Sequence, residues 1–457
     1  MDRCPKCPNK RHCVPANGPE SSRLCFIGEA PGWEEDKKLI PFQGKTGQEV
    51  NRHYLPLAGL SRPNVWFWNA IGCMPATTGG KLDPKRTADL ELLESCSNFH
   101  MFPALRRIRP KIVVPMGSFA NRAIDPEINL EFQHGIPIET EWGSTFPMYH
   151  PSLGIHEPKK MLMIRNDWIR LGKYLKGKLN IPVDEYEGQE DYREIETEEE
   201  LHYILDGNED QVMACDTENR KDRSPFCLTF SITVGTGYLI QAHRSDLLQV
   251  YQEFLDRWTG WILWHNWLHD YEIVTAMGLR FPRKLIRDTM LMVFHLGNLP
   301  QGLKALAYRE LGMTMQDFDD LVKPYSTQLA VNYLRRAYCE DWPKPEQSLQ
   351  RGKDGKWKIT KPHGFSQKLK RFFTDYDKDP EKDVFNMWSD NWEAEQEMVE
   401  KVMGDWPGKC ISHTPFDKII SYATRDADAL LRLWPVIRHM ASRVRKSPQE
   451  RWKEIAA

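Results

Sequence analysis

The chain has 457 residues, of which 40% are hydrophobic, and its formal net charge is only −2. This length predicts two domains, each with enough apolar residues to build a core of its own. No apolar run reaches membrane-spanning length, and the opening residues MDRCPKC do not form a signal peptide. We therefore expect a cytoplasmic protein rather than a membrane or secreted one.

Charge and cysteine content give a first indication of function. Residues 1–176 have a small excess of Lys and Arg, which suits contact with phosphate. The remaining residues have an excess of Asp and Glu, which suits metal binding, although either excess is also typical of a solvated surface. Ten cysteines in a cytoplasmic chain favour metal ligands or reduced thiols over disulfides.

The first chemical signal lies just after an apolar run at residues 24–27, which predicts a buried strand. A turn begins at Gly28 and carries Glu29, and a second turn carries Phe42 between a proline and a glycine. Open α/β sheets bind ligands at such strand ends, and an aromatic ring held in a turn can stack on a flat ligand. The alternative interpretation is a strand followed by an ordinary polar loop.

Further strands and a helix follow in alternation. Residues 65–68 and 111–117 are predicted strands, residues 85–107 have a helical pattern, and residues 146–152 form a fourth strand-like run. Alternating strands and helices predict a parallel sheet. Three of the strand ends carry polar side chains, and connection rules bring such ends to one edge. These residues are Glu29, Asn69 and His150.

The cysteines near the N-terminus form a possible metal site. Cys4 and Cys7 are spaced as CxxC, and Cys13, Cys73 and Cys96 follow. Four thiolates can hold a zinc ion or an iron–sulfur cluster. The alternative is that Cys73 and Cys96 are small buried hydrophobic residues.

Taken together, the motifs GEAPGWEED, PFQG, NAIGCMP, VVPMG and YHPS resemble the family 4 uracil-DNA glycosylases over residues 1–176. The resemblance implies an α/β/α domain with a parallel sheet. It also implies a [4Fe–4S] cluster held by Cys4, Cys7, Cys73 and Cys96, with Cys13 as the substitute if Cys96 is not a ligand.

The resemblance also assigns roles at the strand ends. Phe42 would stack on a flipped uracil, and the Asn69 amide would match uracil O4 and N3–H but not cytosine. His150 would donate a hydrogen bond to uracil O2 as negative charge develops there. The turn that contains Gly28 and Glu29 would position the attacking water and the sugar.

The second half begins after a polar, acidic segment at residues 177–192, which we interpret as a linker. Asp216 and Glu218 lie two residues apart at the end of an apolar strand, so they share one face and can share a cation. A hairpin at residues 228–241 and a strand at residues 262–266 follow. Further polar residues occur in pairs at helical spacing, namely Asn266 with Asp270 and Tyr422 with Asp426.

These motifs, DTE, HNWLHD and YATRD, resemble the proofreading 3′–5′ exonuclease domain of family A DNA polymerases over residues 193–442. The resemblance implies an RNase H-like domain with a mixed sheet. Two Mg²⁺ or Mn²⁺ ions would be held by Asp216, Glu218, Asp270 and Asp426. Asn266 would bind substrate, and Tyr422 would orient the attacking water.

Two segments depart from that family. Residues 315–410 form a long, aromatic and charged insert that we expect to be helical, and residues 443–457 form a basic tail. No polymerase domain follows the exonuclease motifs, so the layout resembles the front end of certain phage DNA polymerases.

We therefore predict a DNA-processing enzyme that combines uracil excision with 3′–5′ exonuclease proofreading for a separate DNA polymerase. A phage-encoded protein of this kind would act in the host cytoplasm. The alternative is a replication scaffold whose first domain only binds or senses uracil, or docks the polymerase, with only the exonuclease active.

Overall fold

The structure is a computed structural model, and it falls into two compact units. The residues it describes are 12–75, 82–83, 86–326, 329, 349–351, 357–359 and 410–442. The first unit comprises residues 1–184, 292–313 and 439–457, and the second comprises residues 185–291 and 314–438. The chain therefore does not divide into two consecutive domains, because residues 292–313 pack with the first unit although they lie between the two segments of the second.

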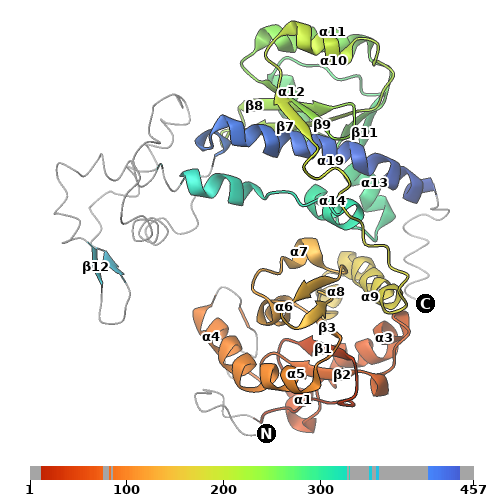
Figure 1. Ribbon diagram of the computed structural model, residues 1–457, viewed down its shortest axis with the longest axis vertical. Helices are drawn as coiled ribbons and strands as arrows, with labels where there is room; N and C mark the ends of the chain where they lie inside the picture. The colour runs from red at the N-terminus through yellow and green to blue at the C-terminus, as the bar shows by residue number, and fades with distance from the viewer. Residues whose placement is uncertain are drawn as a thin grey trace. The chain divides into compact units, whose positions relative to one another are not determined.

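The first unit is built on a five-stranded sheet with the strand order β2-β1-β3-β5-β4 (Figure 1). Its strands are β1 (Leu24–Gly28), β2 (Trp66–Asn69), β3 (Ile112–Pro115), β4 (Ile138–Thr140) and β5 (Gly143–Thr145). The pairs β1–β2, β1–β3 and β3–β5 are parallel, as predicted, whereas β4 is antiparallel to β5 at the edge. The central strands therefore end at one edge of the sheet.

The predicted strand at residues 146–152 is wrong in position. The strand is β5, which ends at Thr145, and beyond it Met148 forms only an isolated bridge with Met116. Pro147 and Pro151 interrupt the run, and proline cannot donate a hydrogen bond to a neighbouring strand.

Side chains of β1 alternate between two buried clusters, which makes the first unit a three-layer α/β/α structure. Cys25 and Ile27 pack with α4, α5 and α6, whereas Leu24 and Phe26 pack with α3 and α9. The helices are α1 (Trp33–Lys38), α2 (Lys45–Glu49), η1 (Val50–Tyr54), α3 (Leu55–Leu57), η2 (Arg62–Asn64), α4 (Thr87–Cys96), η4 (Ser97–Met101), α5 (Phe102–Ile108), α6 (Ser118–Ile124), α7 (Leu130–Gln133), α8 (Ser152–His156), η5 (Pro158–Lys160), α9 (Met161–Leu175) and α14 (Leu303–Leu311).

The second unit contains a six-stranded mixed sheet with the order β11-β10-β7-β8-β9-β6. Its strands are β6 (Asp191–Glu194), β7 (Met213–Asn219), β8 (Pro225–Ser231), β9 (Thr236–Gln241), β10 (Ile262–Trp264) and β11 (Ile286–Asp288). The antiparallel pairing of β8 with β9 confirms the predicted hairpin. β7 is also antiparallel to β8, and β10 and β11 extend the sheet in parallel from the other side of β7. β6 includes the last two residues of the predicted linker.

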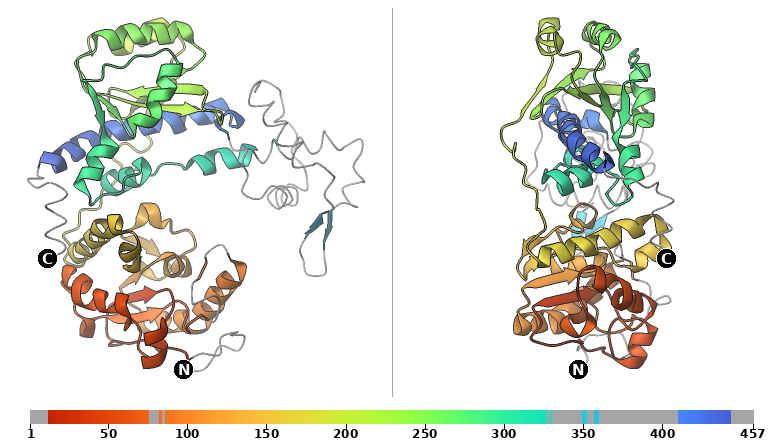
Figure 2. Two further views of the ribbon diagram at one scale, coloured as in Figure 1. Left: turned by 180° about the vertical axis from the view of Figure 1, so that it is seen from behind. Right: turned by 90° about the vertical axis from the view of Figure 1, so that its right-hand side faces the viewer.

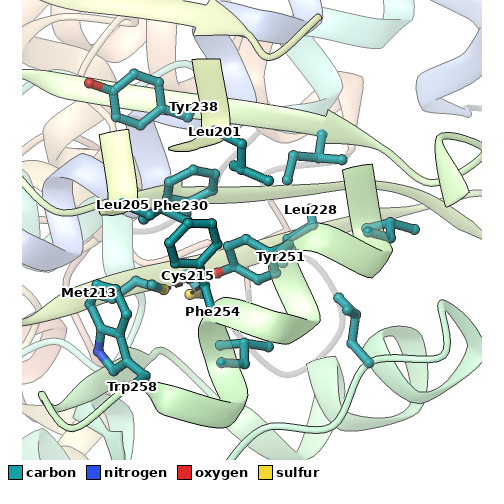
Figure 3. Close-up of a cluster of buried hydrophobic side chains, with 14 of the residues drawn as sticks. Leu201, Leu205, Met213, Cys215, Leu228, Phe230, Tyr238, Tyr251, Phe254 and Trp258 are labelled. Atoms are coloured by element: carbon teal, nitrogen blue, oxygen red, sulfur yellow. Dashed lines mark hydrogen bonds between the residues drawn. The ribbon is translucent and has the colours of Figure 1, made fainter. Parts of the chain in front are cut away.

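Helices cover both faces of this second sheet. On one face, side chains of β7, β8 and β9 pack with α10 and α11 in the cluster drawn in Figure 3. On the other face, β8 and β9 pack with α19, which runs along the sheet as Figure 2 shows from behind. The helices are α10 (Glu198–Leu205), α11 (Ser245–Arg257), α12 (Trp267–Ala276), η6 (Ile411–His413) and α19 (Phe416–Ser442). α13 (Thr289–Leu296) begins in this unit, and its residues from Met292 onward belong to the first.

Several predicted features fall outside the described residues. Cys4, Cys7 and the basic tail at 443–457 are among them, as is most of the insert at 315–410. Within that insert the structure describes a two-stranded antiparallel sheet of β12 (Leu349–Arg351) and β13 (Trp357–Ile359). Of the helices that the structure describes, none combines the length and apolar character needed to cross a bilayer.

Candidate active sites

The carboxyl ends of β1 and β2 bring three predicted site residues together in the first unit. Gly28 and Asn69 are direct partners in the parallel register. A Cβ atom on residue 28 would stand 2.4 Å from Asn69 Oδ1 and 2.8 Å from Phe42 Cζ. Only glycine therefore fits at this strand end, and its absent side chain leaves room for the amide and the ring to meet.

Phe42 is held in an unusual conformation at this edge. Its φ angle is +58°, in the left-handed region, and its side chain is only 4% exposed. The Glu35 carboxylate accepts hydrogen bonds from the backbone N–H groups of both Gly32 and Phe42. The Phe42 ring lies 4.7 Å from the Phe67 ring and 6.5 Å from the His150 ring, measured between centroids. The sequence interpretation missed Glu35 as a supporting residue, although it lies seven residues before Phe42.

His150 is half-buried, and its ring nitrogens have distinct surroundings. Nδ1 lies 2.7 Å from Ser152 Oγ and accepts a hydrogen bond from the Ser152 backbone N–H at 3.4 Å. Burial lowers the pKa of His150 to about 4, so the ring is neutral at neutral pH. A neutral ring whose Nδ1 accepts must carry its proton on Nε2, which makes Nε2 the donor.

Glu29 is anchored at the start of α6. Its carboxylate accepts hydrogen bonds from the Ser118 hydroxyl and the Phe119 backbone N–H. Burial raises the pKa of Glu29, and these two hydrogen bonds oppose that rise. The carboxylate is thus fixed beside the turn that follows β1. Ser118 was not recognised from the sequence.

Three cysteines of the expected cluster lie in the described part of the first unit. Cys13 and Cys73 pair through an isolated antiparallel bridge, and Cys13 Sγ lies 4.0 Å from His100 Nε2. Cys73 and Cys96 are 3% and 1% exposed, so both thiols are shielded from solvent as cluster ligands are. The thiols suit an iron–sulfur cluster in type, and the other two expected ligands, Cys4 and Cys7, lie outside the described residues.

The predicted carboxylates of the second unit come from three elements. Asp216 and Glu218 lie on β7, Asp270 on α12 and Asp426 on α19. Burial raises the pKa of Asp216 well above its usual range, and the charges of Asp270, Asp426 and Glu218 raise it further. The four carboxylates are therefore close enough to repel one another.

Asp270 has a second neighbour that the sequence did not indicate. Its Oδ1 accepts a hydrogen bond of 2.6 Å from Thr217 Oγ1, while burial raises its pKa to about 7. Among the residues described by the structure, no group of three or more His, Cys, Asp or Glu is arranged so that it could hold a metal ion. The four carboxylates thus lie near one another without forming a preformed metal site.

Tyr422 lies near these carboxylates, and Asn266 stands just before the helix that carries Asp270. Tyr422 is 9% exposed on α19, and burial together with Glu218, Asp426 and Asp216 raises its pKa. Asn266 precedes α12 with a φ of +80°.

Asp288 organises the turn before α12. It accepts hydrogen bonds from the backbone N–H groups of Asn266, Trp267 and Leu291. These bonds give Asp288 a structural role.

Comparison with known proteins identifies the family of the N-terminal part of the chain. The model of the uracil DNA glycosylase superfamily matches residues 15–170. The type-4 uracil-DNA glycosylase of Archaeoglobus fulgidus is 31% identical over 182 residues, which cover 37% of this chain and 87% of that protein. The N-terminal part of this chain belongs to the uracil-DNA glycosylase superfamily.

Two further relatives match a similar share of the chain. The type-4 uracil-DNA glycosylase of Saccharolobus solfataricus is 26% identical over 188 residues, 38% of this chain and 83% of that protein. The one from Thermotoga maritima is 30% identical over 158 residues, 33% of this chain and 78% of that protein.

Proposed function

We propose that this protein is a uracil-DNA glycosylase that hydrolyses the N-glycosidic bond of uracil in DNA. The observation that carries the proposal is the meeting of Gly28, Phe42 and Asn69 at one strand end, with the His150 ring 6.5 Å from that of Phe42. The relatives named type-4 uracil-DNA glycosylase support it.

Each residue has a task that its surroundings allow. Phe42 stacks on the flipped base, and its fixed backbone keeps the ring in place. The Asn69 amide both donates and accepts, so it pairs with uracil O4 and N3–H and rejects cytosine. His150 donates from Nε2 to uracil O2, where negative charge develops as the bond breaks. Glu29, anchored by α6, keeps the turn after β1 in position for the attacking water.

A [4Fe–4S] cluster fits the chemistry of the cysteines in this proposal. Cys4, Cys7, Cys73 and either Cys96 or Cys13 would hold it. When bound, the cluster would join these cysteines, which come from distant parts of the chain, through iron–thiolate bonds. The residues that contact uracil are not its ligands.

The direct test is release of uracil from a uracil-containing single strand in the presence of EDTA. EDTA removes divalent cations and so suppresses nuclease activity, whereas the residues proposed for excision need no divalent metal. We expect alkali-labile breaks at the uracil, and their loss in Asn69→Ala and His150→Ala. Intact strands with the wild-type protein would instead favour a scaffold whose first unit only binds uracil or docks a partner.

We propose a second activity, 3′–5′ exonuclease, for the second unit. The supporting observation is the convergence of Asp216, Glu218, Asp270 and Asp426 from β7, α12 and α19. The sheet order also supports it, because a three-strand meander extended by two parallel strands is expected of an RNase H-like domain. Two Mg²⁺ or Mn²⁺ ions would neutralise the carboxylates and stabilise charge on the phosphodiester. Tyr422 would then orient the attacking water, and Asn266 would contact the substrate.

The exonuclease is tested with a labelled 3′ end and Mg²⁺. We expect wild-type protein to shorten the strand and Asp216→Ala to leave it intact. Digestion by Asp216→Ala at the wild-type rate would overturn the assignment. Proofreading in trans for a separate polymerase is part of this second proposal. If it is correct, adding this protein to a polymerase reaction should remove mismatched 3′ ends before the polymerase extends them.

A further inference from the structure

A pocket of about 400 Å³ lies in the first unit beside the segment that carries His150. Its walls come from residues 131–163 and from residues 294–305, and both segments belong to that unit. Tyr149, the residue immediately before His150, lines the pocket. Gly28, Phe42, Asn69 and His150 are not among its lining residues, so the pocket is a separate site next to the proposed uracil site.

The lining combines aliphatic side chains with four aromatic rings and carries little net charge. The Tyr149 ring has the His134 ring at 4.8 Å and Lys160 Nζ at 5.6 Å from its centroid. Phe294 and His295 complete the aromatic lining, and the Phe294 side chain is 55% exposed. Proteins that hold single strands stack bases on such rings.

The charged side chains around the pocket favour an uncharged base over a phosphate group as its ligand. Lys160 is paired with Glu157 at 3.3 Å, and Glu131 adds a carboxylate to the lining. A phosphate group in the pocket would find Lys160 already paired with Glu157 and would be repelled by the Glu131 carboxylate. A flat, uncharged base does not need to compete for Lys160, is not repelled by Glu131, and can stack on the aromatic rings.

The wall formed by residues 294–305 is fixed to the rest of the unit. The Arg309 guanidinium lies 3.2 Å from Asp167 and 3.4 Å from His134 Nδ1, and all three side chains are buried. Asn166 Nδ2 donates a hydrogen bond of 3.2 Å to the Asn298 carbonyl. The pocket is thus formed before any ligand arrives, which lowers the entropic cost of binding.

We propose that this pocket is a second DNA subsite, which takes an unpaired nucleobase of the same single strand close to the flipped uracil. This inference rests on the proposed glycosylase function of the neighbouring site. It assigns a role to residues 294–305, which lie beyond the part of the chain that matches the glycosylases. The subsite gives the enzyme a preference for unpaired strands, because a paired base cannot enter.

Fluorescence of 2-aminopurine tests the subsite without catalysis. The fluorophore is placed at successive positions around a thymine or a non-cleavable uracil analogue in a single strand, with EDTA present. In the wild-type protein, we expect stacking to quench the fluorescence strongly at one position relative to the thymine or uracil analogue. The variants Phe294→Ala and His295→Ala should lose that quenching. Tyr203→Ala, which removes an 85% exposed aromatic ring from the second unit, is the matched control and should quench as wild type does.

Kinetics separate failure of the subsite from failure of the glycosylase. Phe294→Ala should raise the KM for a long single strand about tenfold and leave a uracil trinucleotide unaffected, because the trinucleotide does not reach the pocket. If wild type releases uracil from both substrates and Phe294→Ala behaves identically, the subsite is wrong. If wild type releases no uracil, the glycosylase proposal fails, and quenching in the thymine strand still decides whether the pocket binds a base.

Discussion

His150 shows how one residue's surroundings set the pH range of the proposed reaction. Burial lowers its pKa to about 4, so the ring stays neutral with Nε2 as donor well below pH 7. Titration of His150 should therefore leave the rate of uracil release unchanged between about pH 5.5 and 8. The rate should fall as the pH approaches about 4. There, protonation of Nδ1 would break the hydrogen bond from the Ser152 N–H. A fall centred near pH 6.5 would contradict this assignment.

The same shift affects stability with a defined sign. An unfolded histidine titrates near its ordinary value of about 6.5, so between about pH 4 and 6.5 the unfolded chain binds more protons than the folded one. The contribution of His150 to the free energy of unfolding therefore decreases as pH falls through this window. His150→Gln should remove that part of the pH dependence, which denaturant unfolding at a series of pH values would measure.

Glu35 acts on the proposed reaction through Phe42. Its carboxylate accepts hydrogen bonds from the backbone N–H of Gly32, just before α1, and from that of Phe42, after α1. The backbone of Phe42 has a left-handed conformation. Hydrogen bonds to a charged acceptor contribute about 1.5–3 kcal/mol each. We expect Glu35→Ala to lower kcat/KM for uracil release about tenfold or more. Glu34→Ala, a neighbouring exposed carboxylate, is the control and should leave it unchanged.

At the scale of elements, β7, α12 and α19 converge with carboxylates that repel one another. Burial and the three neighbouring carboxylates raise the pKa of Asp216, so the folded state binds its proton more tightly than the unfolded state does. Its favourable contribution is then present at low pH and lost as pH rises through the folded pKa. Asp216→Asn should therefore raise Tm at neutral pH in EDTA by about 2–4 °C.

Added Mg²⁺ completes this test. It should raise the Tm of the wild-type protein and have a smaller effect on Asp216→Asn, because the variant has lost a ligand. Glu253→Gln, which neutralises an exposed carboxylate on α11, is the control for a general charge effect. Two outcomes would argue against a cation site. In one, Asp216→Asn lowers the Tm measured in EDTA. In the other, added Mg²⁺ leaves the Tm of the wild-type protein unchanged.

At the scale of the whole molecule, the ion pair of Arg309 with Asp167 joins distant parts of the chain within the first unit. Burial would raise the pKa of Asp167, but His134 and Arg309 outweigh it and lower the pKa. Arg309→Met should cost about 3–5 kcal/mol, because it leaves a buried carboxylate with one partner fewer. The double variant Arg309→Met/Asp167→Asn should be less destabilised than the sum of the single variants, as measured by denaturant unfolding. Additive effects would mean that the pair is not coupled.

The sequence by itself determined where strands end and which residues stand there. Apolar runs that stop at Gly28 and Asn69 gave the sheet edge, and alternation along β7 gave the shared face of Asp216 and Glu218. Such patterns are local, because side-chain periodicity follows directly from strand geometry. Motifs that stand at strand ends were therefore accessible without the fold.

Only the tertiary structure decided how those residues are supported. It selected Glu35 as the partner of Phe42, Nε2 as the proton-bearing atom of His150, and Thr217 as the hydrogen-bond partner of Asp270. It also placed residues 292–313 in the first unit, which no consecutive division of the sequence indicated. These outcomes depend on packing and burial between residues far apart in the chain, and local periodicity carries no information about such contacts.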